Sequence, residues 1–128
     1  MEERHVFGKI YSATIAVADQ DKALDFYMNT LGWEKGMDNQ MGPDMRFLTV
    51  IPSGAETSLV LGHTSWFQDV LPPAKIGISL TTPDIDATYE TLTSRGVTFK
   101  QPVEMMPWGQ KAAWFYDIDE NEFFLVEE

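Results

Sequence analysis

Polar and apolar residues alternate in two stretches that lie about half the chain apart. The more apolar positions are Ala13, Ile15 and Val17 in the first stretch, and Ile78, Leu80 and Thr82 in the second. A period of two residues predicts a β-strand with one apolar face. The opposite faces of these strands carry small residues, namely Ser12, Thr14 and Ala16, and Gly77, Ser79 and Thr81.

A helical period follows each strand. Apolar residues recur at Ala23, Leu24, Tyr27 and Leu31 after the first strand, and at Ile85, Tyr89 and Leu92 after the second. Asp19 and Asp84 precede these segments and fit helix starts, where unpaired backbone amides favour an acidic side chain. Gly32 and Gly96 fit the helix ends. The two stretches therefore form an approximate repeat.

Three further strands are expected in each copy, at 34–37, 45–52 and 57–63, and at 98–103, 111–116 and 122–126. The sequence thus predicts an α+β fold of two βαβββ modules in a single domain over 1–128. Module one spans about 8–64, a linker 65–74, and module two about 75–128. One such half cannot bury its apolar face alone. We therefore expect the two sheets to curl around a shared cleft.

Composition narrows the class of protein. The chain has 128 residues, enough for one domain, and 44% of them are hydrophobic. It has no cysteine, which excludes disulfides, thiolate nucleophiles and cysteine-ligated zinc. The first residues lack the apolar run of a secretion signal, and no segment is long and apolar enough to span a membrane, so we expect a cytoplasmic protein. The net charge of -11 disfavours nucleic-acid binding and would weakly attract a cationic small molecule.

Two motifs carry a family resemblance. The stretch VADQDKALDFYMNTLGW (17–33) resembles the first-module signature of the vicinal oxygen chelate superfamily. The stretch PWGQKAAWFYDIDENEFFLVE (107–127) resembles its closing motif, with Ile118 and Glu120 in place of the usual Pro and Gly. That superfamily includes glyoxalase I, extradiol dioxygenases, and bleomycin- and fosfomycin-resistance proteins. The resemblance implies the glyoxalase/bleomycin resistance fold and a homodimer.

The metal site of this family is not matched. Its metal-binding members place a His at the start of the first strand of each module and a Glu in the last strand of each. These positions fall on Ser12, Gly77, Val60 and Phe124, none of which binds a divalent ion well. We therefore expect no metal cofactor. His63 and Glu122 are alternative ligands, although His63 is more readily interpreted as an edge or surface residue.

The predicted ligand pocket follows from strand parity. It comprises Ser12, Thr14, Ala16, Ser58, Val60, Gly77, Ser79, Thr81, Trp108, Glu122 and Phe124. Glu122 is the candidate catalytic residue, as a general base or a partner for a ligand cation, but a place in solvent at the strand start is favoured. Trp66 and Trp108 either border the pocket or fill the module junction or a dimer contact. Trp114 is expected in the core, and Arg46 in solvent or in a salt bridge rather than at a ligand.

Two functions remain open on this evidence. The first is a metal-independent binding protein that holds a small organic ligand, cationic or aromatic, in the cleft. The alternative is an enzyme of the lyase, isomerase or dioxygenase type that uses Glu122 or a non-standard metal site. Neither nucleic acid nor membrane is expected as a partner. The sequence leaves open whether the modules pair within one chain or across a homodimer.

Overall fold

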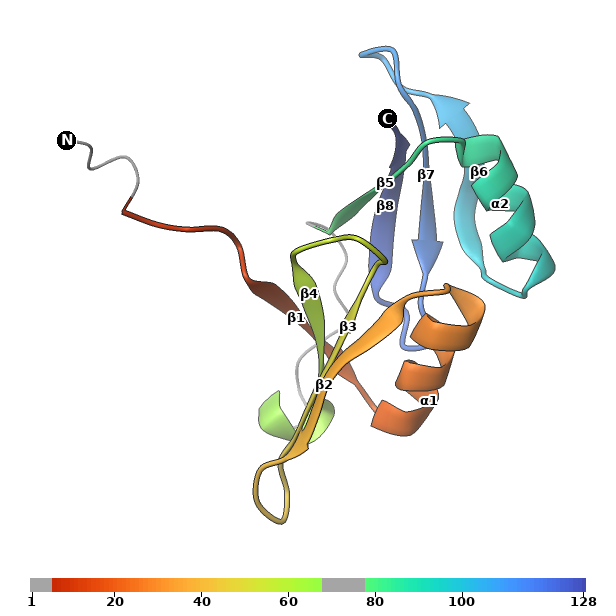
Figure 1. The fold of residues 1–128 in the computed structure, drawn as a ribbon. Coiled ribbons are helices and arrows are strands. Elements are labelled where there is room, and N and C mark those ends of the chain that lie inside the picture. Colours follow the sequence, from red (N-terminus) through yellow and green to blue (C-terminus); the bar gives the residue numbers. More distant parts are fainter. Residues whose placement is uncertain (1–5, 68–77) are drawn as a thin grey trace.

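The structure, a computed structural model, describes residues 6–67 and 78–128 and contains two modules of the same design (Figure 1). Module one consists of β1 (Ser12–Val17), α1 (Gln20–Asp25), the π-helical turn η2 (Phe26–Thr30), β2 (Glu34–Gln40), β3 (Arg46–Ile51) and β4 (Ser58–His63). A 3-10 turn, η3 (Thr64–Phe67), follows it. Module two consists of β5 (Ser79–Thr82), α2 (Ile85–Ser94), β6 (Phe99–Met105), β7 (Lys111–Tyr116) and β8 (Glu122–Glu127). The predicted α+β fold of two βαβββ modules is confirmed.

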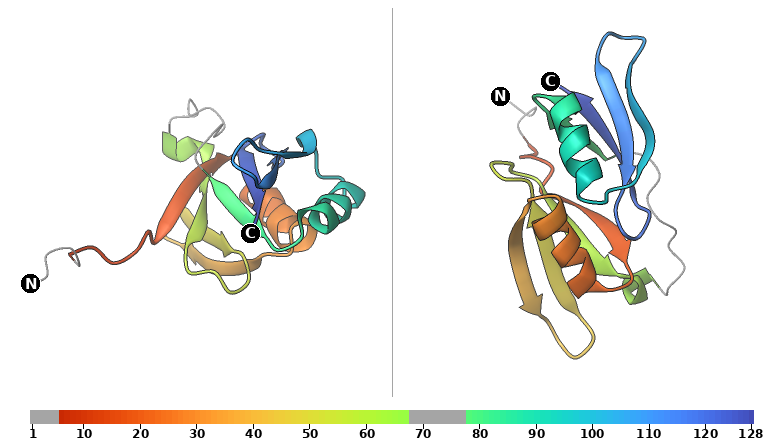
Figure 2. Two further views of the ribbon diagram at one scale, coloured as in Figure 1. Left: turned by 90° about the horizontal axis from the view of Figure 1, so that it is seen from above. Right: turned by 90° about the vertical axis from the view of Figure 1, so that its right-hand side faces the viewer.

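The two sheets share one topology. Their strand orders are β1-β4-β3-β2 and β5-β8-β7-β6, and in each the first strand runs parallel to the last. Thr14 lies opposite Val60 in the first sheet, and Ser79 lies opposite Phe124 in the second. Figure 2 shows the two modules side by side, each with its helix on one face of its sheet. No helix in the described part of the chain has the length and apolarity needed to cross a membrane.

Both helices begin where the sequence predicts. The Asp19 carboxylate accepts a hydrogen bond from the amide of Lys22 at 3.0 Å, and that of Asp84 accepts one from Ala87 at 3.2 Å. Gly32 and Gly96 follow the helices with φ angles of 80° and 90°, which side chains rarely adopt. The first helix differs from expectation, because its second half widens into the π-helical turn η2.

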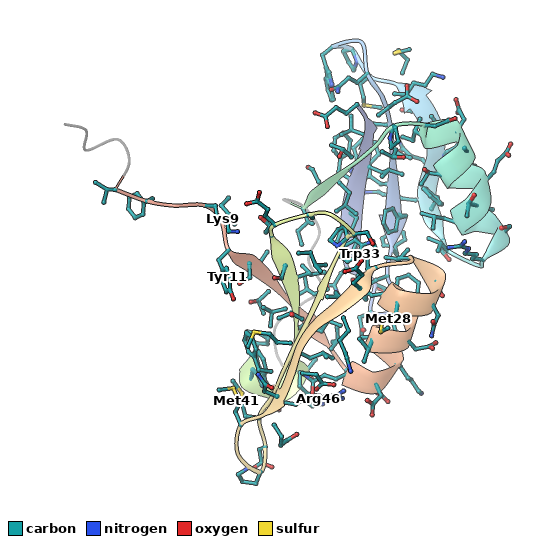
Figure 3. The ribbon with its side chains drawn as sticks, viewed as in Figure 1. Lys9, Tyr11, Met28, Trp33, Met41 and Arg46 are labelled. Carbon is teal, nitrogen blue, oxygen red and sulfur yellow. The ribbon has the colours of Figure 1, made fainter. Side chains whose placement is uncertain are left out.

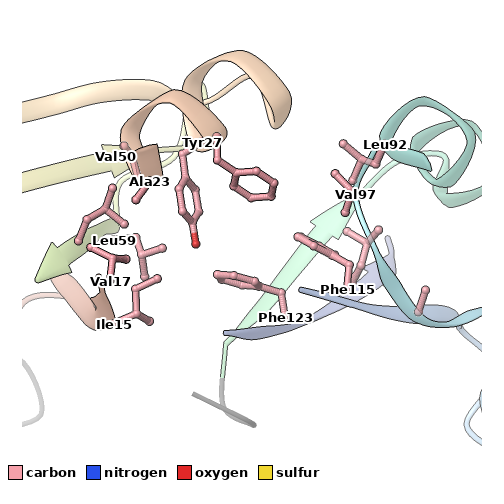
Figure 4. Close-up of a cluster of buried hydrophobic side chains, with 14 of the residues drawn as sticks. Ile15, Val17, Ala23, Tyr27, Val50, Leu59, Leu92, Val97, Phe115 and Phe123 are labelled. Atoms are coloured by element: carbon pink, nitrogen blue, oxygen red, sulfur yellow. The ribbon is translucent and has the colours of Figure 1, made fainter. Parts of the chain in front are cut away.

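One buried core joins the modules. The helix-covered faces of both sheets contribute to it, and Figure 4 shows Val17, Tyr27, Phe115 and Phe123 converging there. The rings of Phe115 and Phe123 stack with centroids 5.3 Å apart, and Phe123 also meets Tyr27 at 6.3 Å. The modules of one chain therefore pack through their helix-covered faces.

A buried hydrogen-bond network ties the turn between β7 and β8 to module one. The hydroxyl of Tyr27 donates to Asp117 Oδ2 at 2.7 Å. The side-chain amide of Asn121 donates to the same oxygen at 2.9 Å and to the carbonyl of Ala16 at 3.1 Å. Burial, and next the charge of Asp117, raise the pKa of Tyr27 well above its usual range. Tyr27 therefore stays a hydrogen-bond donor at all ordinary pH values.

Asp119, in the same turn, should make stability depend on pH. Its Oδ1 accepts from the amide of Ala18 at 3.0 Å, whereas its buried Oδ2 has no hydrogen-bond partner in the described part of the chain. Burial is the main cause that raises the pKa of Asp119 above its usual value of 3.8, and nearby Asp117 and Asp19 add to it. The folded state therefore disfavours the ionised carboxylate of Asp119. As pH rises through the folded pKa of Asp119 and the carboxyl ionises, the free energy of unfolding should fall.

We expect Asp119→Asn to be more stable than wild type at pH 7, by less than about 1 kcal/mol. The gain should disappear at pH values below 3.8, where wild-type Asp119 is protonated in both states. Urea denaturation of both proteins at several pH values measures the difference. A gain that stays constant down to the lowest pH would contradict the electrostatic explanation.

Candidate ligand-binding site

Each sheet has a second face, opposite its helix, here called the cup face. The module-one cup face carries Ser12, Thr14, Ala16, Phe47, Thr49, Ser58, Val60 and Gly62. The module-two cup face carries Ser79, Thr81, Ala112, Trp114, Tyr116, Glu122, Phe124 and Val126. Strand parity predicted most of these residues correctly as neighbours on one face of each sheet. Gly77 lies outside the described residues.

Trp66 covers one end of the module-one cup face. It belongs to η3, which lies on the side of the sheet away from α1 (Figure 1). A Cβ atom on Gly62 would lie only 2.8 Å from the Trp66 ring, so this glycine allows the ring to lie flat against the strand. Phe47 is parallel to Trp66, with ring centroids 6.5 Å apart. The indole nitrogen is buried without a hydrogen-bond partner among the described residues.

The module-two cup face carries its own aromatic pair. Trp114 lies opposite Phe124 in the β7–β8 register, and their ring centroids are 4.7 Å apart. Both side chains are only half-buried. The expectation that Trp114 belongs to the core is wrong: Trp114 is half-buried on the cup face, whereas its neighbours Ala113 and Phe115 are fully buried on the helix-covered face. Each module thus presents an aromatic pair on its cup face.

Glu122 is buried rather than solvated. Only 6% of its side chain is exposed, and Lys100 Nζ lies 3.3 Å from its Oε2. The favoured interpretation, a carboxylate in solvent at the strand start, is therefore wrong. Lys100 can reach the cup face because the β6–β7 register shifts between Phe99 and Gln101. The ion pair balances the negative charge of the buried Glu122 carboxylate.

The residues present do not fit the metal site found in related folds. Ser12, Val60 and Phe124 occupy three of the four ligand positions, and they offer one neutral hydroxyl between them. His63 Nδ1 accepts from the amide of Ser65 at 3.0 Å, and Glu122 is held by Lys100. Across residues 6–67 and 78–128, no cluster of three or more His, Cys, Asp or Glu side chains could hold a metal ion.

Two further sequence candidates lie away from the centre of the cup faces. Arg46 points to the helix-covered side, where its guanidinium donates to Asp38 and to Asp21 at 2.8 Å (Figure 3). The hydrogen bond from Arg46 is the main cause that lowers the pKa of Asp38. Of the two environments expected for Arg46, solvent or a salt bridge, the structure shows the salt bridge. Trp108 lies in the β6–β7 turn, is 61% exposed, and donates from Nε1 to Gln110 at 2.8 Å.

Only part of the predicted pocket lines a cavity within one chain. Ser58, Ser79 and Thr81 border a cavity at the module junction, which belongs mainly to the helix-covered side. Thr14, Ser79 and Thr81 are exposed. Four cup-face residues could not be predicted from the sequence. Phe47, Thr49 and Tyr116 lie in strands with apolar residues on both faces, which give no parity signal, and Lys100 reaches Glu122 only where the β6–β7 register shifts. The pairing registers supply that information.

Comparisons with known proteins agree with this fold. Residues 9–125 match the family model described as Glyoxalase/Bleomycin resistance protein/Dioxygenase superfamily. The chain is 34% identical over 119 residues to the uncharacterized protein YetH of Bacillus subtilis, covering 93% of this chain and 98% of YetH. Among solved structures, it is similar to a superfamily member from Sphaerobacter thermophilus, with 60% identity, a TM-score of 0.91, and coverage of 96% and 99% of the two chains.

A second solved structure carries a functional description. TnmS3, an antibiotic binding protein from Streptomyces sp. CB03234, is 38% identical to this chain and superposes with a TM-score of 0.82. The match covers 94% of this chain and 96% of TnmS3.

Proposed function

Because the chain belongs to the glyoxalase/bleomycin resistance protein/dioxygenase superfamily, we propose that it is a metal-independent binding protein for a small aromatic organic molecule. The observation that carries this proposal is the aromatic pair on each cup face, Trp66 with Phe47 and Trp114 with Phe124. Flat aromatic side chains stack favourably on flat ligands. The cup faces therefore offer two stacking surfaces and small residues between them.

The polar groups of the cup faces indicate which hydrogen-bonding groups and which charge a ligand would carry. The buried indole nitrogen of Trp66 has a hydrogen to donate and lacks an acceptor in the described chain, so a ligand carbonyl or ether oxygen there would satisfy it. Glu122, paired with Lys100, can accept from a ligand hydroxyl or amine. The overall charge of -11 further favours a neutral or cationic ligand over an anionic one.

The complete site is proposed to form in a homodimer. The modules of one chain share a core through their helix-covered faces, whereas Thr14 and Thr81 on the two cup faces are exposed in the single chain. If the module-one cup face of one copy met the module-two cup face of another, the two aromatic pairs would enclose one ligand. A symmetric dimer would then contain two such sites.

The similarity to TnmS3 supports this class of ligand. TnmS3 is an antibiotic binding protein, and the match spans nearly the whole of both chains. We propose that this chain likewise holds an antibiotic-like organic molecule without changing it. The absence of suitable residues at the metal-ligand positions also supports binding over metal-dependent catalysis.

A thermal-shift screen against a panel of neutral, cationic and anionic polycyclic aromatic compounds tests the proposal. At least one compound should raise the melting temperature and quench tryptophan fluorescence in a saturable way. Trp114→Ala should weaken that binding by at least about tenfold, since it removes one stacking surface. Ile118→Ala, which trims an exposed apolar residue of the β7–β8 turn, is the control and should leave affinity unchanged.

Mass spectrometry of the recovered compound separates binding from catalysis. The compound should return unchanged after long incubation. A converted compound, with conversion lost in Glu122→Gln, would replace the binding proposal with the enzymatic alternative. Equal loss of affinity in Trp114→Ala and Ile118→Ala would show that the cup face is not the site.

A further inference from the structure

The cavity at the module junction lies mainly on the helix-covered side of the sheets, and Ser58, Ser79 and Thr81 are the cup-face residues that also border it. It has a volume of about 450 Å³ and lies between the helix-covered sides of the two sheets. Ala13 on β1, Leu59 on β4, and Leu80 on β5 form its strand walls, and Leu92 on α2 forms part of its helical wall. Ala13 and Thr14 are adjacent on β1, so their side chains point to opposite faces: Ala13 to this cavity and Thr14 to the cup face.

The lining of this cavity specifies the chemistry of an occupant. Among the described residues that line it, none is Asp, Glu, Lys, Arg or His, and leucine, isoleucine, tryptophan and phenylalanine side chains are prominent. A buried charge would lack a partner there, which excludes charged occupants. Hydroxyl groups are present, including Thr82 and Thr88, whose oxygens are 2.7 Å apart. A neutral molecule that is mostly hydrocarbon, with one or two hydrogen-bonding groups, fits this surface.

The walls of the cavity are fixed by contacts of their own. Trp33, which Figure 3 labels at the module junction, packs against Tyr27 with ring centroids 5.2 Å apart. Arg95 donates from Nη1 to the carbonyl of Thr30 at 2.9 Å, which links the end of α2 to the end of η2. Thr57, at another part of the rim, donates to the carbonyl of Ile10 at 2.7 Å. These contacts hold the cavity open between the modules.

We propose that this cavity is a second binding site, for an uncharged and largely apolar small molecule, separate from the proposed cup site. The volume is within the range of natural ligand pockets, which begins near 300 Å³. Occupation would bridge the two modules, because both contribute walls. Binding of a small molecule there would therefore stabilise the packing of the two modules against each other.

The uncharged fluorophore N-phenyl-1-naphthylamine is a suitable probe. It should bind with saturable fluorescence enhancement, and Ala13→Phe should weaken that binding at least about tenfold by filling the cavity. Thr14→Phe, the adjacent residue on the opposite face, should leave the probe's affinity within about twofold. Ala55→Trp is a second variant that should obstruct the cavity and weaken probe binding. Ala55 lies in an exposed loop at the cavity rim, so a large side chain there should not disturb the core.

Nuclear magnetic resonance of leucine and valine methyl groups places the probe independently of any variant. The methyl signals of Leu31, Leu80 and Leu92 should shift on titration, whereas those of Val60 and Val126 on the cup faces should not. Shifts confined to Val60 and Val126, or no saturable binding, would overturn the proposal. Cavity methyl signals that move with protein concentration and not with probe would assign this surface to a second copy of the chain, which also overturns it. Ala13→Phe tests only the cavity, and Trp114→Ala tests only the cup face. A negative result for the cavity would therefore leave the proposed function of the cup faces to be tested separately.

Discussion

Replacing Asp117 with alanine is expected to lower the free energy of unfolding by about 3–5 kcal/mol. The carboxylate is buried and accepts four hydrogen bonds: from the Tyr27 hydroxyl, the backbone amides of Asp119 and Asn121, and the Asn121 side chain. Alanine would leave these donors buried without an acceptor, which is more costly than the loss of exposed hydrogen bonds. Because the network joins the modules, their contact should weaken with it.

Urea denaturation monitored by tryptophan fluorescence measures this change. Asp117→Asn keeps one acceptor oxygen and should lose less stability than alanine. Asp86→Ala, which removes an exposed carboxylate of α2 paired with Lys111 of β7, should change stability little and serves as control. Comparable losses in Asp86→Ala and Asp117→Ala would mean that the buried network does not hold the modules together.

The second large effect is expected at two adjacent residues of β8 with opposite roles. Phe123 is fully buried between Phe115 and Tyr27, so Phe123→Ala should lower the free energy of unfolding by about 3–5 kcal/mol. Phe124 is half-buried on the cup face beside Trp114. Phe124→Ala should therefore lower stability by only about 1 kcal/mol, while it weakens aromatic ligand binding at least about tenfold.

Denaturation curves and ligand titrations on the same two variants check this pair of outcomes. Ligand binding by Phe123→Ala is measured at a temperature where the variant remains folded. If Phe124→Ala proved as destabilising as Phe123→Ala and bound ligand normally, the assignment of β8 faces would be wrong.

The fold could be predicted from the sequence because local signals repeat at equivalent places. Asp19 and Asp84 cap the helices, Gly32 and Gly96 end them, and residues 111–116 form the strand that was expected. These features depend on backbone chemistry within a few residues, which a single sequence records. The connectivity then follows from the order of the elements.

The site could be predicted only where one strand face differs clearly from the other. The alternation at Ala13 and Thr14 indicated a cup face, whereas the runs around Arg46 and Trp114 are apolar on both sides and gave no orientation. Their orientation depends on partners distant in sequence, such as Asp21 for Arg46 and Phe124 for Trp114. Glu122 was placed in solvent because its partner, Lys100, reaches it only through a shift in strand register.

The parallel pairing of the first and last strand in each sheet sets an order of events during synthesis. β1 has no sheet partner until β4 has been made, and β5 must wait in the same way for β8. Module one can therefore close its sheet once the chain has been made as far as His63, while Tyr27 still lacks Asp117. During that interval the surface that later becomes the shared core is open to solvent. A nascent chain at this stage would be a natural client for a chaperone, and slow translation between residues 64 and 121 would prolong its exposure.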